Sequence, residues 1–91
     1  MSLHLVFSPA GLNACSRRWQ RGDKCVLLGN GVYAHKQALN AGVESANLHL
    51  LAPDAEARGI NNTATGALAH IDYPTLVELT QQCSPIVSWN E

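Results

Sequence analysis

Apolar residues in this chain gather in short unbroken runs, and the clearest run covers residues 25–28. The run does not alternate with polar residues, so it predicts a strand buried on both faces in the middle of a parallel sheet. Gly29-Asn30-Gly31 follows and predicts a tight turn, after which residues 32–39 are expected to form a helix. In open α/β sheets, ligands and chemistry usually lie at this carboxyl end of the strands.

The rest of the chain continues the alternation of strands and helices. Ser8 is expected to cap a helix that has Pro9 at its first position and ends at Gly22-Asp23. Asp72-Tyr73-Pro74 starts another helix. The remaining apolar runs predict strands, and the polar stretches between them predict a short helix and a loop: strands 3–7, 47–51, 67–71 and 86–89, helix 53–59 and loop 61–66. This order predicts one α/β domain over residues 1–91, with three α/β/α layers and a mainly parallel sheet of about five strands.

The charge content indicates a partner subunit. Only 14% of the 91 residues are charged, against about a quarter in typical soluble domains. A small domain with so few charges is expected to have part of its surface covered by another protein, although Asn, Gln, Ser and Thr offer an alternative polar surface. A net charge of −1 gives no general attraction for nucleic acid. A basic cluster, Arg17, Arg18, Arg21 and Lys24, is interpreted as a solvated face because only Trp19 lies near it.

The cysteine count and the sequence of the first residues indicate the cellular compartment of the protein. Three cysteines without a CxxC pair argue against a disulfide framework and for a reducing compartment. Residues 1–9 lack the pattern of a signal peptide, and no apolar run approaches the roughly 20 residues of a membrane span. We therefore expect a cytoplasmic protein.

No metal or cofactor is expected. The four histidines, His4, His35, His49 and His70, lack metal-ligand spacing and are interpreted as structural. The glycine pair at residues 29–31 follows the second strand and is too short for a dinucleotide-binding loop. Asp72 and Tyr73 follow a strand, where catalysis is conceivable, but helix capping explains Asp72 more simply.

The cysteines carry the remaining candidate chemistry. Cys25 falls in the buried strand and Cys83 on an apolar helix face, so both are interpreted as core residues. Cys15 shares a helical face with Leu12 and Trp19, which favours burial, yet it lies near the basic cluster, which favours a reactive thiolate. Both interpretations of Cys15 stay open on the pattern alone.

Several segments resemble one family over nearly the whole chain. They are the opening Leu3-His4 and Val6 followed by Ser8-Pro9, then GDKCVLLGNGVYA, LAPDAEARGI, IDYPTLVELTQQC and the terminal SPIVSW. Together they resemble the TusB/DsrH family of sulfur-relay subunits. The chain departs from the family pattern at Asn30, where an acidic residue is common.

The resemblance implies a DsrEFH-like fold with flavodoxin-like layering, in a complex with TusC/DsrF-like and TusD/DsrE-like subunits arranged as a dimer of heterotrimers. Such complexes pass persulfide sulfur to a downstream acceptor protein, for 2-thiolation of the tRNA wobble uridine or for sulfur oxidation. The principal sulfur-accepting cysteine of these complexes belongs to the TusD/DsrE-like subunit. Cys15 matches a cysteine of the DsrH branch, seven residues before Gly22.

Three hypotheses follow from these observations. In the first, the chain is an assembly subunit, non-catalytic or accessory to a sulfurtransferase complex. In the second, it is a persulfide carrier in its own right through Cys15. The third, a free-standing flavodoxin-like ligand-binding domain, is disfavoured because Ser8-Pro9-Ala10-Gly11 makes a poor phosphate loop.

Overall fold

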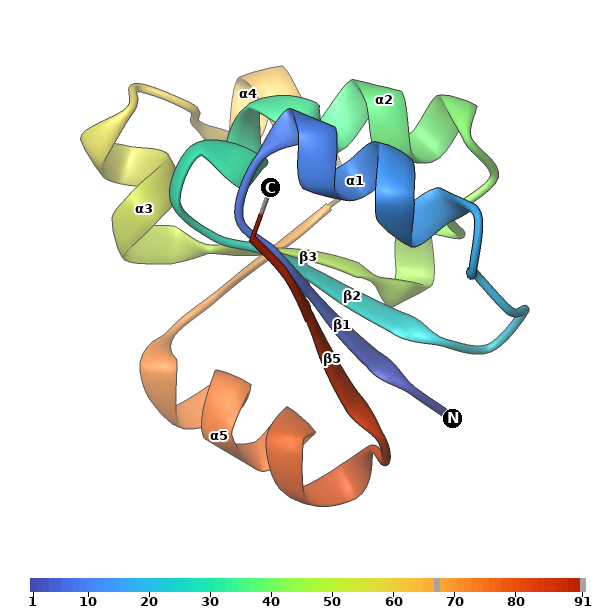
Figure 1. The fold of residues 1–91 in the computed structure, drawn as a ribbon. Coiled ribbons are helices and arrows are strands. Elements are labelled where there is room, and N and C mark those ends of the chain that lie inside the picture. The colour runs from blue at the N-terminus through green and yellow to red at the C-terminus, as the bar shows by residue number, and fades with distance from the viewer. Residues whose placement is uncertain (67, 91) are drawn as a thin grey trace.

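A five-stranded, entirely parallel sheet forms the middle layer of the computed structural model, which describes residues 1–66 and 68–90 (Figure 1). The strand order is β4-β3-β2-β1-β5. The strands are β1 (Leu3–Val6), β2 (Lys24–Leu27), β3 (Leu48–Leu51), β4 (Ala69–Ile71) and β5 (Ile86–Trp89). The strand predicted at residues 25–28 is β2, and it lies in the centre of the sheet with Cys25, Val26 and Leu27 fully buried. Its continuous apolar run is explained because helices cover both of its faces.

Helices cover the two faces of the sheet unequally (Figure 1). One face carries most of them, whereas α5 lies alone on the other face. The helical elements are α1 (Pro9–Ser16), η1 (Gly29–Ala34), α2 (His35–Asn40), η2 (Ser45–Asn47), α3 (Ala52–Ala57), α4 (Asn62–Thr65) and α5 (Tyr73–Gln82), where η marks a 3₁₀ helix. The predicted three-layer α/β/α class is confirmed.

Two predicted helix starts are confirmed by their capping hydrogen bonds. The Gly11 backbone N–H donates to Ser8 Oγ over 3.0 Å, and the Thr75 N–H donates to Asp72 Oδ1 over 2.9 Å. Each cap satisfies a backbone donor that the first turn of a helix leaves without a partner. Proline follows closely in both helices, as the sequence predicted.

The first helix is shorter than predicted. It ends at Ser16, and residues 17–23 form turns in place of further helix. The Gln20 N–H donates to Asp23 Oδ2 over 3.1 Å, and the Asp23 N–H donates to the Gln20 carbonyl over 3.0 Å. A side chain that bonds its own backbone in this way competes with the helix.

Three other predictions differ from the structure in detail. Residues 32–39 are helical as predicted, but residues 32–34 belong to the 3₁₀ segment η1, which starts directly at Gly29, and α2 begins at His35. A Cβ at Gly31 would collide with the Val6 carbonyl oxygen, so this turn packs directly on the end of β1 and requires glycine. The stretch predicted as a loop over residues 61–66 contains the short helix α4. In the strand predicted over 67–71, residue 67 lies outside the described part, and β4 begins at Ala69.

The two faces of the sheet hold separate apolar clusters. Cys15 and Cys25 belong to the cluster beneath α1, together with Leu12, whereas Cys83 belongs to the cluster beneath α5, together with Leu79. All three cysteines are free and buried. The sheet therefore separates Cys83 from the other two thiols.

Candidate functional site

Cys15 lies at the end of α1 and faces the sheet. It is the residue before the last one of the helix, and its exposed fraction is 0%. The predicted common face with Leu12 is confirmed, because Leu12 is equally buried in the same cluster. Trp19 packs against this cluster from the turn after the helix, so its contact does not come from helical spacing. The last turn of a helix is the negative end of the helix dipole and gives a thiolate no stabilisation.

The neighbours of Cys15 nevertheless favour the thiolate. A hydrogen bond from the Cys25 thiol is the largest influence, and with the contact to His4 it outweighs burial and lowers the Cys15 pKa to about 6. The same hydrogen bond raises the Cys25 pKa well above its ordinary value, so Cys25 is the donor. These neighbours therefore favour the thiolate form of Cys15 over the thiol.

The basic cluster is solvated, as interpreted, and it is not what favours the Cys15 thiolate. Arg17, Arg18 and Arg21 are exposed at the surface, and the dominant influences on Cys15 come from Cys25 and His4. The cations are close to Cys15 along the chain, but Cys15 is buried against the sheet, whereas the three arginines are exposed. Nearness in sequence was a poor guide because α1 ends before the arginines begin.

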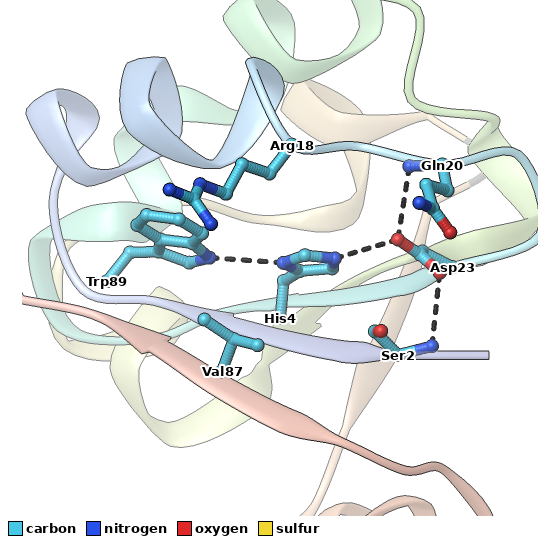
Figure 2. A pocket seen from close by; sticks show the side chains of 7 residues that line it. All are labelled: Ser2, His4, Arg18, Gln20, Asp23, Val87 and Trp89. Carbon is cyan, nitrogen blue, oxygen red and sulfur yellow. Dashed lines mark hydrogen bonds and ion pairs between the residues drawn. The ribbon is translucent and has the colours of Figure 1, made fainter.

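His4 is the side chain that connects Cys15 with the surface of the protein. Its Nε2 lies 2.9 Å from Asp23 Oδ2, and its Nδ1 accepts a hydrogen bond from Trp89 Nε1 over 3.1 Å (Figure 2). The bond from Trp89 fixes the proton of neutral His4 on Nε2, where it is donated to Asp23. The imidazole stacks on the Trp89 ring at 6.2 Å and tilts against the Trp19 ring at 5.2 Å. Hydrogen bonds and rings thus hold His4 in one orientation.

Asp23 anchors this network from the turn before β2. Besides His4 it accepts the backbone N–H groups of Ser2 at 3.0 Å and Gln20 at 3.1 Å (Figure 2). Burial alone raises the Asp23 pKa, but the bond with His4 and the two N–H donors lower it by more. Asp23 is therefore a buried carboxylate with three donors, and it ties the start of the chain to the turn that leads into β2.

Opposing influences act on the protonation of His4. Burial lowers its pKa, but the interactions with Cys15 and Asp23 raise it by more, so the pKa lies above the ordinary 6.5. The indole N–H of Trp89 acts against protonation, because only an unprotonated Nδ1 can accept it. His4 thus has contacts that favour each of its protonation states.

A pocket of about 410 Å³ opens beside His4 on the α1 face of the sheet. It lies above β5, and its lining consists of Ser2, His4, Arg18, Gln20, Asp23, Val87 and Trp89 (Figure 2). Figure 2 shows the Arg18 side chain extending over Trp89. The pocket brings solvent to the histidine that neighbours the buried Cys15.

The other residues considered in the sequence lie away from this site. The turn at residues 29–31 is a tight strand-to-helix connection, as interpreted: the Gly29 N–H donates to Asp54 Oδ2 over 2.7 Å. Asn30 Oδ1 accepts a hydrogen bond from Arg58 Nε over 3.0 Å. His70 Nε2 lies 2.7 Å from Thr65 Oγ1. Across residues 1–66 and 68–90, no three His, Cys, Asp or Glu side chains are arranged to hold a metal ion.

Sequence reasoning missed the functional pairing of His4, Asp23 and Trp89. One signal was available: His4 occupies the inward position of a strand whose other residues are apolar, where a polar side chain requires a partner. The partners lie 19 and 85 positions away along the chain, so no local spacing indicated them.

Comparison with known proteins identifies the family. A family model described as "DsrH like protein" matches residues 6–85. The chain is also 34% identical over 87 residues to "Protein TusB" of Pectobacterium parmentieri, and the match covers 88% of each chain.

The chain belongs to the TusB/DsrH family. The resemblance noted in the sequence is thereby confirmed, and the family indicates a sulfur-relay subunit. None of the helices in the described residues is both long enough and apolar enough to cross a bilayer.

Proposed function

We propose that this chain is chiefly an assembly subunit of a TusBCD- or DsrEFH-like sulfur-relay complex in the cytoplasm. Its partners are TusC/DsrF-like and TusD/DsrE-like subunits in a dimer of heterotrimers. The observation that carries the assembly role is the complete burial of Cys15, whose exposed fraction is 0%. A sulfur atom enclosed in this way cannot meet a cysteine of another protein without a change in conformation.

Exposed apolar side chains support the presence of a partner. Tyr73 and Val77 lie one turn apart on α5 with exposed fractions of 56% and 53%, and Ile86 on β5 is 45% exposed. Large apolar side chains exposed near one another often mark a protein interface. The solitary position of α5 on its face of the sheet leaves room for a neighbouring subunit there (Figure 1).

Co-expression with the two homologous subunits tests the assembly role. We expect a stable complex on size-exclusion chromatography, weakened by Val77→Glu because the charge would be buried against a partner. Gln82→Glu, which adds the same charge at another exposed position of α5, is the control and should leave the complex intact. Assembly of the other two subunits alone, with this chain eluting separately, would refute the proposal.

The destination of the sulfur is also a proposal. The relay serves either 2-thiolation of the tRNA wobble uridine or sulfur oxidation, through a downstream acceptor protein. Deleting the gene and measuring 2-thiouridine in tRNA separates the two. Loss of 2-thiouridine supports the tRNA branch, whereas unchanged 2-thiouridine with impaired oxidation of reduced sulfur supports the other.

A second candidate function is a persulfide carrier through Cys15. The observation that favours it is the lowered pKa of about 6, because a thiolate is the form that attacks a persulfide. Treating the assembled complex with a persulfide donor and measuring intact subunit masses tests this function. A gain of one sulfur on this chain that disappears in Cys15→Ser supports a carrier. Sulfur found only on the TusD/DsrE-like partner, with transfer unaffected by Cys15→Ser, leaves this chain as an assembly subunit alone.

A further inference from the structure

We propose that Cys15 and Cys25 form a dithiol pair that converts the sulfur taken up by Cys15 into hydrogen sulfide. This inference rests on the proposed uptake of sulfur by Cys15 and extends it to a second reacting thiol. Cys25 has no part in the assembly role or in a simple carrier.

The fold places the two thiols against each other. Cys25 lies on the central strand β2, opposite His4 of β1 in the parallel register, and its side chain faces α1. Cys15 faces the sheet from α1 in the same apolar cluster, and the two thiols lie close enough to shift each other's pKa in opposite directions. Both have exposed fractions of 0%, so each thiol is enclosed with the other.

Burial decides which nucleophile reaches a persulfide formed on Cys15. Bulk thiols do not reach the closed cluster, whereas Cys25 lies within it. Cys83 is also buried, but it lies in the cluster on the other face of the sheet. Cys25 is therefore the cysteine of this chain that is placed to attack Cys15.

The reaction balances in two steps. In the first, the Cys15 thiolate attacks the outer sulfur of a persulfide R–S–SH; a new S–S bond forms on Cys15, the old S–S bond breaks, and the thiol R–SH leaves. In the second, Cys25 attacks Sγ of Cys15 and forms a Cys15–Cys25 disulfide, the bond to the outer sulfur breaks, and that sulfur leaves as hydrogen sulfide with the Cys25 proton. The two thiols lose two electrons and the transferred sulfur gains them. A dithiol reductant restores the pair once a change in conformation opens the cluster.

The pocket beside His4 sets the size of donor that can bind next to the buried pair, and neither cysteine lines it. It opens next to the histidine that interacts with Cys15, and its walls include Trp89 and Val87 (Figure 2). A small donor such as inorganic hydropolysulfide fits a pocket of about 410 Å³. The test therefore uses hydropolysulfide on the full chain, both alone and in the co-expressed complex.

The experiment measures the intact mass of the chain, which reports sulfur gained and hydrogen lost. Released sulfide is trapped by a bimane reagent and quantified under anaerobic conditions. With hydropolysulfide the leaving group of the first step is itself sulfide or a shortened polysulfide, and the second step releases one more sulfide per chain. In the wild type we expect the mass to fall by two hydrogens, this one additional sulfide per chain to be released, and peptide mapping to find a Cys15–Cys25 disulfide. In Cys25→Ala we expect a stable gain of one sulfur on Cys15 and one sulfide fewer per chain than in the wild type, because only the first-step leaving group is released; Cys15→Ser should release neither. Cys25→Val, which fills the site with an apolar side chain, should behave in the same way if Cys25→Ala folds poorly. Cys83→Ala is the matched control and should behave as the wild type.

The outcomes separate this inference from the carrier proposal. A wild type that keeps one added sulfur on Cys15, without a disulfide, overturns the dithiol pair and leaves the carrier standing. Absence of added sulfur in Cys25→Ala and Cys25→Val, with both variants folded by circular dichroism, overturns the carrier and the dithiol pair together. Sulfide release from Cys25→Ala equal to that of the wild type also overturns the inference.

Discussion

The network around Asp23 yields the sharpest prediction of stability. Asp23→Asn keeps the shape of the side chain but replaces one acceptor oxygen with an NH₂ donor. The native carboxylate accepts hydrogen bonds from Ser2, Gln20 and His4 and is only 3% exposed. An amide cannot accept all three, so at least one buried donor loses its partner and His4 loses its counter-charge.

The expected cost follows from the burial of the pair. Breaking a buried ion pair by removing one partner costs about 3–5 kcal/mol, and an unsatisfied buried donor costs about 1–3 kcal/mol. The amide retains part of the bonding, so we expect a loss of about 3 kcal/mol in the free energy of unfolding. For a domain of this size that lowers Tm by roughly 12–24 °C. A chain with a total stability of about 5–14 kcal/mol still folds in the cold after this loss.

The stability that the Asp23–His4 pair contributes depends on pH in a characteristic way. The Asp23 pKa is lowered from 3.8, so its contribution is present above pH 3.8 and is lost as the pH falls through the folded-state pKa. The His4 pKa is raised from 6.5, so its contribution is full below pH 6.5 and is lost as the pH rises through the folded-state pKa. The pair therefore stabilises the fold most between pH 3.8 and 6.5.

Urea unfolding followed by circular dichroism at several pH values is the assay. Asp72→Asn is the control, because Asp72 is an exposed helix cap and asparagine caps helices equally well. We expect the difference between the two variants to be largest between pH 3.8 and 6.5. If Asp23→Asn lies within about 0.5 kcal/mol of Asp72→Asn throughout, the network does not hold the fold as argued.

Three further predictions concern single positions. Trp89→Phe removes the indole N–H that favours neutral His4, so the His4 pKa should rise further in an NMR titration of the ring; an unchanged value would show that the bond has no effect on protonation. Cys83→Ala should lower the free energy of unfolding by about 1 kcal/mol, and Cys83 should react slowly with iodoacetamide in the native state; fast labelling would contradict its burial. Gly31→Ala should cost about 3 kcal/mol in a denaturant titration, because a Cβ there collides with a carbonyl of β1, and wild-type stability would show that the turn can shift freely.

The sequence predicted the sheet well because the sheet leaves local traces. The apolar run at residues 25–28 identified the central strand, and the caps at Ser8 and Asp72 identified two helix starts within a few residues. Such features depend on neighbours in the chain, so pattern and capping chemistry suffice to find them. The order of the strands and the solitary position of α5 carry no comparable local trace.

The sequence predicted only part of the candidate site, because the site depends on contacts between residues that are far apart in the chain. Cys15 could be singled out from its helix face, but its thiolate depends on Cys25 and His4, which the fold brings from two strands. The adjacent basic cluster was the wrong source of stabilisation, because the helix ends at Ser16 and the arginines remain in solvent. A shift in pKa that arises from tertiary contacts cannot be read from residues that are merely close in sequence.

The burial of Cys15 and its low pKa place opposite demands on any sulfur transfer. The lowered pKa, about 6, favours the thiolate, while an exposed fraction of 0% withholds it from other proteins. A change that exposes Cys15 to a partner must also separate it from Cys25 and His4, which maintain the thiolate. Exposure to a partner would thus raise the pKa at the moment of transfer, whereas reaction with a small donor in place would not. This opposition is the physical reason for proposing sulfur chemistry inside the closed chain in place of direct exchange with another subunit.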